Sequence, residues 1–127
     1  MKDFVAIIDL GLSNLHNVKL ACDKLNINTK FTSNPKMVSR AKAIILPGVG
    51  SFREAMQRIK KLKIEEIIKE TIDKNKPLLG ICLGMQLLFS HGEEFGKCKG
   101  LNIFNGKVKK LNFENKKNTK YSVPHVG

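Results

Sequence analysis

The chain has 127 residues, enough for one domain with a hydrophobic core, and its 23 Lys and Arg against 11 Asp and Glu give a formal net charge of +12. The lysines are spread along the sequence without the aromatic-rich basic stripe typical of nucleic-acid-binding surfaces, so we expect no nucleic-acid partner. No apolar run reaches the ~18 residues of a membrane-spanning helix, and residues 1–10 are too short and too charged for a signal peptide. We therefore expect a cytoplasmic protein without a membrane segment.

Three cysteines, Cys22, Cys82 and Cys98, stand far apart in the sequence. Their odd number and wide spacing favour a reducing compartment over a disulfide framework. Cys and His never fall at the spacing of metal ligands, so we expect no metal and no cofactor. We expect Cys22 to be a hydrophobic residue on a helix face and Cys98 to be a loop thiol, because neither follows a strand in a sharp turn.

Continuous apolar runs alternate with helical patterns through the first 80 residues. The predicted strands are residues 4–8, 30–32, 43–46 and 78–81. Asn14 and Ser51 are suited to cap two helices, residues 33–35 favour a turn or a helix start, and a further helical pattern covers residues 64–75. This alternation predicts an α/β fold with an open, mostly parallel, doubly wound sheet that is covered by helices on both faces.

The pattern changes in the last third of the chain. Residues 85–89 favour the start of another helix, whereas residues 100–113 favour one or two antiparallel strands around Asn105 and Gly106, a dipeptide typical of hairpin turns. Residues 115–127 are polar and complete no element. Because no repeat or linker divides the chain, we expect a single domain over residues 1–127 that is incomplete at its C-terminal end.

The sequence Gly80-Ile81-Cys82-Leu83-Gly84 joins a predicted strand to a predicted helix. It has the form Gly-x-nucleophile-x-Gly, in which a sharp turn holds the nucleophile at strained backbone angles. We expect the Cys82 thiol to be exposed at the carboxyl end of the sheet, beside helical N–H groups that favour a thiolate and a Leu83 N–H aimed at an oxyanion. The alternative is that Cys82 is a small buried hydrophobe and the glycines serve packing alone.

Four motifs together resemble the class I (triad) glutamine amidotransferases. They lie at residues 9–15, 46–52, 79–88 and 123–127, and span essentially the whole chain. The resemblance implies a flavodoxin-like domain in which Cys82 attacks the side-chain amide of glutamine, forms a glutamyl thioester and releases ammonia. The first and last motifs narrow it to the branch that forms a heterodimer with a cyclase subunit of the (β/α)8-barrel type and supplies ammonia for histidine biosynthesis.

The resemblance also implies an oxyanion hole beside the nucleophile. Leu83 and Val49 would each donate a backbone N–H to the oxyanion. Gly48 and Gly50 would permit the peptide at Val49 to reorient, as the family is thought to require, because Gly accepts both signs of φ. These residues stand in the run Pro-Gly-Val-Gly after the third predicted strand.

Two polar residues are implied as contacts of the glutamine substrate. Gln86 stands one helical turn after the nucleophile and would help to hold the head group, with Glu94 as a weaker candidate. The alternatives are an exposed polar residue on a helix for Gln86 and a solvated charge for Glu94.

The family activates its nucleophile with a His that is oriented by a Glu two residues later, in a His-Pro-Glu segment beyond residue 127. We expect none of His16, His91 and His125 to replace that base. Because the members of a triad act as a unit, we expect the chain to be a fragment or truncated product that is inactive as it stands.

Three other interpretations remain open from the sequence. The motifs do not separate the histidine branch from paralogues that supply ammonia to surface-sugar pathways. A hydrolase or peptidase of related α/β form also carries a Cys in a sharp strand-to-helix turn. The chain is alternatively a non-catalytic assembly piece that docks on a cyclase barrel through basic residues such as Arg53 and Arg58.

Overall fold

The computed structural model describes residues 2–12, 14–94 and 96–112, so the motif at residues 123–127, with His125, lies outside the described residues. In chain order the elements are β1 (Val5–Ile8), α1 (Leu15–Lys24), β2 (Thr29–Thr32), α2 (Pro35–Arg40), β3 (Ala43–Gly48), α3 (Phe52–Lys61), α4 (Glu65–Asp73), β4 (Leu78–Cys82), α5 (Leu83–Gln86), β5 (Phe89–Gly92), β6 (Cys98–Lys99) and β7 (Phe104–Val108). The larger sheet is parallel, with strand order β2-β1-β3-β4. A second sheet has the order β6-β5-β7.

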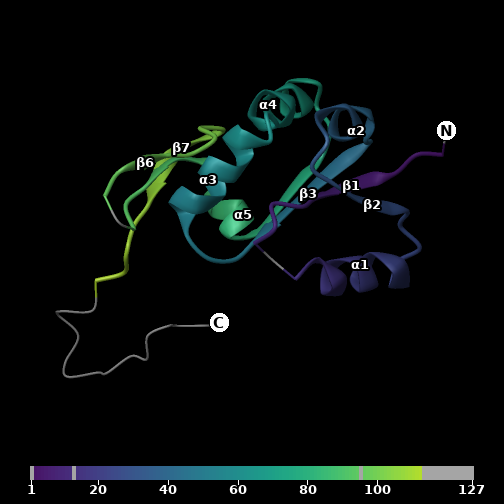
Figure 1. The fold of residues 1–127 in the computed structure, drawn as a ribbon, viewed down its shortest axis with the longest axis horizontal. Helices are drawn as coiled ribbons and strands as arrows, with labels where there is room; N and C mark the ends of the chain where they lie inside the picture. Colours follow the sequence, from purple (N-terminus) through teal and green to yellow (C-terminus); the bar gives the residue numbers. More distant parts are fainter. Residues whose placement is uncertain (1, 13, 95, 113–127) are drawn as a thin grey trace.

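The larger sheet is covered on both faces, as the sequence predicts. In Figure 1, α1 lies on one side of it and α2, α3 and α4 lie on the other, while the smaller sheet lies to the left of α3 and α5. Ile44 and Leu46 of β3 pack in the core with α3 and α4, whereas Val5, Ile7 and Ile45 pack in a separate cluster beside α1. Burial of each such side chain stabilises the fold by roughly 1.5–3 kcal/mol.

The helices begin where the sequence predicts caps. Asn14 Oδ1 accepts a hydrogen bond from the His16 N–H at 3.1 Å, and Ser51 Oγ accepts one from the Glu54 N–H at 3.3 Å. Each bond satisfies a backbone donor that has no partner within the helix. The two caps therefore fix the points at which the chain leaves β1 and β3 and enters the helices.

Lys76 ties the end of α2 to the turn before β4. Its Nζ donates hydrogen bonds to the Ser39 carbonyl at 2.7 Å and to the Ala41 carbonyl at 3.0 Å. Replacing Lys76 with Met is expected to lower the free energy of unfolding by about 1.5 kcal/mol, because two buried or half-buried carbonyls lose a charged donor. The measurement is the urea midpoint. The exposed Lys74→Met is the control, and a shift of equal size in that variant would contradict the assignment.

The prediction that residues 85–89 start a helix is wrong beyond Gln86. The helix α5 ends at Gln86, and Phe89 already belongs to β5. The reason is tertiary, because the Leu87 carbonyl accepts from the Leu101 N–H at 2.7 Å and the Leu88 carbonyl accepts from the Ile103 N–H at 2.8 Å. These carbonyls bond to a distant segment instead of to the next helical turn.

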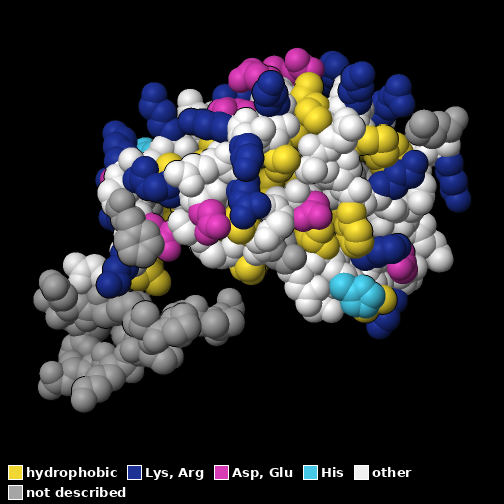
Figure 2. Space-filling view, viewed as in Figure 1, with side chains coloured by type: hydrophobic (Ala, Val, Ile, Leu, Met, Phe, Trp, Pro, Cys, Tyr) yellow, Lys and Arg dark blue, Asp and Glu magenta, His cyan; other side chains and the backbone are white. Residues whose placement is uncertain are grey.

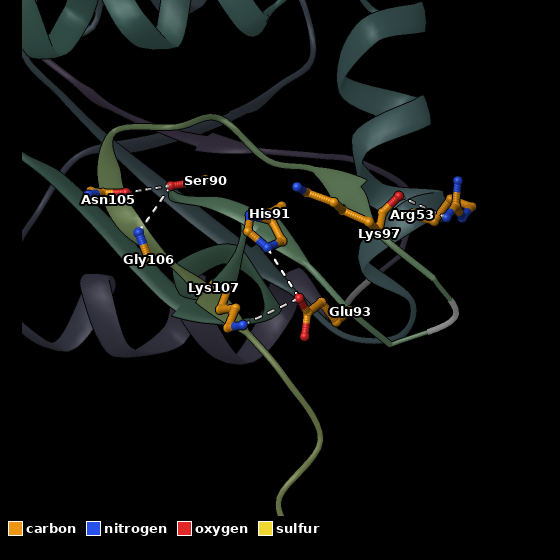
Figure 3. A network of polar contacts seen from close by, with 8 residues as sticks. All are labelled: Arg53, Ser90, His91, Glu93, Lys97, Asn105, Gly106 and Lys107. Atoms are coloured by element: carbon orange, nitrogen blue, oxygen red, sulfur yellow. Dashed lines mark hydrogen bonds and ion pairs between the residues drawn. The ribbon is translucent and has the colours of Figure 1, made fainter.

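The hairpin expected at Asn105 and Gly106 is also wrong. Both residues lie inside β7, which pairs with β5 in parallel, and among the described strands only β5 and β6 pair in the antiparallel sense. A register shift places the dipeptide opposite Ser90, whose Oγ accepts from the Gly106 N–H at 3.0 Å (Figure 3). The same Oγ donates to the Phe104 carbonyl at 3.3 Å. Asn105 and Gly106 therefore form a β-bulge instead of a turn, and Gly106 has a φ of 152°.

The surface carries charge over most of the visible face. Figure 2 shows Lys and Arg side chains distributed across it with Asp and Glu among them. Within the described ranges, no helix combines the length and the apolar character needed to cross a lipid bilayer.

Candidate active site

Cys82 ends β4 at the point where the chain turns sharply into α5. Its backbone has φ 53° and ψ −121°, a conformation that costs a non-glycine residue about 1–3 kcal/mol and persists only where its surroundings impose it. The residue is exposed, and the register pairs it with Gly48 at the carboxyl end of β3. The nucleophile candidate and the Pro-Gly-Val-Gly segment thus meet at one edge of the sheet.

The glycines on either side of Cys82 allow α5 to pack directly on the sheet. A Cβ on Gly84 would overlap the carbonyl oxygen of Leu46 in β3, and a Cβ on Gly80 would lie 2.7 Å from the Cα of Met85. Gly48 lies close to the same helix, because a Cβ there would be 3.3 Å from the Cβ of Leu83. Backbone contacts around all three glycines therefore hold the strained turn in place.

The helix after Cys82 offers one turn of N–H groups. Leu83 is its first residue, so the Leu83 N–H has no acceptor within the helix and stands directly beside the nucleophile. A helix of four residues has a smaller dipole than a long helix. The useful feature is the position of this N–H directly beside the nucleophile.

The segment after β3 lies open beside the nucleophile. The Val49 side chain is 57% exposed, and Gly50 has a φ of +102° with open space where a Cβ would stand. A positive φ at Gly50 is readily accessible to glycine and strained for other residues. A side chain at Gly50 would therefore meet open space at the point where a peptide reorientation would have to occur.

A cavity of about 520 Å³ opens between α3, α5 and the smaller sheet, and its lining includes Gly50, Gln86 and Glu94. This volume lies within the range typical of small-molecule sites. Glu94 Oε2 accepts a hydrogen bond from the Phe52 N–H at 3.2 Å, which holds its carboxylate at the N-terminus of α3. Three residues that were singled out separately in the sequence are thus brought together, whereas Cys82 is not among the residues that line the cavity.

A His–Glu pair at the end of β5 is not among the residues that the sequence motifs indicate. Glu93 follows His91 at the two-residue spacing that the family uses, and their Nε2 and Oε1 atoms lie 3.4 Å apart. Lys107 Nζ lies 3.7 Å from the same carboxylate oxygen (Figure 3). His91 thus points to Glu93 just after β5, and no hydrogen bond between His91 and Cys82 is found among the described residues.

The other two cysteines lie within a helix and a strand. Cys22 is buried beneath the sheet in α1, as expected, but Cys98 lies in β6 and is not a loop residue. In the part of the chain that the structure describes, no group of three or more His, Cys, Asp or Glu side chains is placed to hold a metal ion.

The family of this chain is shown by a family model that matches nearly its whole length. A family model described as "Glutamine amidotransferase class-I" matches residues 6–125, a span that contains the Cys82 turn and the strand end at Val49. The chain belongs to the class I glutamine amidotransferase family. This confirms the family that the four sequence motifs indicate.

Curated members of this amidotransferase family are about 40% identical in sequence to this chain. The protein named "Imidazole glycerol phosphate synthase subunit HisH" from Oceanobacillus iheyensis is 42% identical over 123 residues, and the protein of the same name from Bacillus subtilis is 40% identical. Each match covers 97% of this chain but 58% of the relative. The chain therefore spans less than two thirds of the length of these relatives.

A solved structure agrees with the fold of this amidotransferase chain. The structure titled "Crystal structure of glutamine amidotransferase" superposes with a TM-score of 0.73 at 20% identity, covering 88% of this chain and 59% of the other. At this identity the likeness concerns the fold alone.

Proposed function

We propose that this chain carries the nucleophile and the oxyanion donors of a glutaminase. The observation on which the proposal rests is Cys82, exposed at φ 53° at the end of β4 and paired in register with Gly48. An exposed thiol in a strained turn, next to the first N–H of a helix, is the arrangement that nucleophilic acyl transfer requires. Val49 and Leu83 are the proposed oxyanion donors, from the strand end and from α5.

The proposed reaction has two steps. Cys82 Sγ attacks the side-chain carbonyl carbon of glutamine, and the charge that develops on the oxygen is stabilised by the two N–H donors. The C–N bond then breaks, the nitrogen takes up the proton lost by the thiol and leaves as ammonia, and a glutamyl thioester remains. Water attacks the thioester, which releases glutamate and restores the thiol.

The cavity beside this turn is the proposed glutamine site. Gln86 and Glu94 line it together with Gly50. A carboxylate suits the α-ammonium group of glutamine, and a side-chain amide suits the polar groups of the same molecule. Glu94 is held at the end of α3 by its bond to Phe52, so it is positioned before the substrate arrives.

The proposal includes a base that the described residues do not provide. His91 is paired with Glu93 in the smaller sheet and His16 is exposed near the start of α1, and neither contacts the thiol. The 127 residues by themselves are therefore proposed to release little or no ammonia, because a nucleophile without its base loses most of its rate.

The proposed biological role is that of the curated relatives. The chain is proposed to be part of the amidotransferase subunit of an imidazole glycerol phosphate synthase, which passes ammonia to a cyclase subunit of the (β/α)8-barrel type in the cytoplasm for histidine biosynthesis. The support is the identity of about 40% to proteins that carry this name. These relatives do not favour the surface-sugar branch, and a likeness of fold alone does not favour a peptidase.

The test is covalent capture by the glutamine analogue 6-diazo-5-oxonorleucine. We expect mass spectrometry to place the adduct on Cys82, slowly in the 127-residue chain and rapidly once the remaining part of the Bacillus subtilis relative is joined after residue 127. Excess glutamine should slow the modification because it occupies the same cavity. Adduct formation that glutamine does not slow, or that occurs on another cysteine, would contradict the proposal.

A further inference from the structure

The connection between β5 and β6 carries Glu94. β5 ends at Gly92 and β6 begins at Cys98, so Glu94 stands outside both strands. Glu94 is exposed, and so is Lys97, three residues later. A carboxylate that is to meet an ammonium group at a fixed place needs a backbone that is held, because an unrestrained connection spreads the charge over many positions. The contacts made by this connection therefore decide where the Glu94 carboxylate stands.

The aromatic ring of Phe52 supports the chain on either side of this connection. Phe52 is the first residue of α3 and is buried. A Cβ on Gly92 would lie 2.8 Å from its ring, and a Cβ on Gly100 would lie 2.9 Å from its Cζ atom. Real Cβ atoms essentially never come this close, so both backbones pack directly on the ring. The end of β5 and the chain after β6 are thus seated on the start of α3.

Two consecutive residues of α3 then bond to the connection itself. The Phe52 N–H donates to Glu94 Oε2 at 3.2 Å. Arg53 Nη2 donates to the Lys97 carbonyl at 3.5 Å, as Figure 3 shows. The guanidinium also lies over Gly96, where a Cβ would be 3.8 Å from Nη2. The cavity left between these groups measures about 10 Å³, room for at most about one water molecule, so the connection is packed against α3 as well as bonded to it.

We propose that Arg53 is a positioning residue for the glutamine site. Its guanidinium holds the Lys97 carbonyl against α3, and because Lys97 follows Glu94 by three residues, this bond limits how far the Glu94 carboxylate can move from the cavity that it lines. Arg53 acts on the substrate through Glu94 and not by contact. The inference rests on the proposed function, because it takes the cavity as the glutamine site and Glu94 as the contact of the α-ammonium group.

The test measures how the rate of Cys82 modification in the 127-residue chain depends on the concentration of 6-diazo-5-oxonorleucine, which carries the α-ammonium group of glutamine. Arg53→Met removes the guanidinium and keeps an unbranched side chain. We expect it to raise the half-saturating concentration by about threefold to tenfold, the effect of one lost charge-assisted hydrogen bond, with the maximal rate within about twofold of the parent. An unchanged or lowered half-saturating concentration would overturn the inference.

Two matched comparisons show whether the effect passes through Glu94. Arg58→Met makes the same chemical change on α3, where Arg58 lies 4.0 Å from Glu54, and it should leave the half-saturating concentration unchanged. The deamino analogue 6-diazo-5-oxohexanoate lacks the ammonium group, so it should modify Cys82 equally fast in the parent and in Arg53→Met. An equal rise in Arg58→Met, or an equal slowing of both analogues by Arg53→Met, would contradict the assignment.

Two further measurements separate this inference from effects on the turn and from the proposed function. Iodoacetamide reacts with a thiol without occupying an amino-acid site, so it should modify Cys82 at the same rate in the parent and in Arg53→Met. A different rate would show that the turn has moved, which contradicts a role through Glu94. If glutamine does not slow the modification of the parent by 6-diazo-5-oxonorleucine, the proposed function fails. If glutamine slows it and Arg53→Met behaves as the parent does, this inference alone fails.

Discussion

Replacing Cys82 with Ser is expected to lower glutaminase activity by about 10⁴-fold or more in the protein completed with the unmatched part of the Bacillus subtilis relative. The sulfur atom forms the covalent bond to the substrate, and an alcohol in the same place is a far weaker nucleophile without a base adapted to it. The measurement is ammonia release from glutamine, coupled to an optical assay. The 6-diazo-5-oxonorleucine adduct should disappear in the same variant.

Two controls separate the nucleophile from the other reactive side chains. Cys98→Ser makes the same chemical change in β6, and His91→Ala removes the histidine of the His91–Glu93 pair. Both variants should keep activity within a few-fold of the parent. Activity that survives Cys82→Ser would show that Cys82 is not the reacting group. An equal loss of activity in His91→Ala would show that the base has been placed wrongly.

Replacing Gly84 with Ala is expected to lower the free energy of unfolding of the 127-residue chain by about 3 kcal/mol or more. The added methyl group would overlap the Leu46 carbonyl oxygen, and both partners are backbone of packed elements, so neither can move without displacing α5 from β3. Urea denaturation followed by circular dichroism measures the change. A variant that does not fold agrees with the prediction.

Gly50→Ala is the matched control, because it adds the same methyl group in open space. It should lower the free energy of unfolding by only about 1–2 kcal/mol, because a φ near +102° is strained for a residue with a Cβ. If Gly84→Ala costs less than Gly50→Ala, close packing of α5 on the sheet does not hold the turn.

The same packing links stability to function. Gly80 and Gly84 let α5 approach the strands, and this approach leaves Cys82 at the junction with φ 53°. The strain at Cys82 is offset by the burial of Leu83, Leu87 and their neighbours in the core. A substitution that loosens α5 should therefore reduce nucleophile reactivity before it unfolds the sheet.

The sequence by itself determined the parallel sheet, its helices and the turn at Cys82. These features depend on short-range chemistry: apolar runs such as residues 43–46, caps at Asn14 and Ser51, and glycines at fixed positions around one cysteine. Each is specified within a few residues, so the local pattern agrees with the final fold. The strand end at Val49 and the turn at Cys82 meet because parallel strands end at the same edge.

Only the tertiary structure decided the conformation of the chain after Gln86 and the partners of the residues around the site. The Leu87 carbonyl bonds to the Leu101 N–H, and Ser90 bonds to Gly106, so contacts 14 and 16 residues apart replaced the expected helix and hairpin. The position of Glu94 at the end of α3 depends on a bond that spans 42 residues. Local propensity does not encode such partners, because a carbonyl or carboxylate takes whichever donor the fold brings within reach.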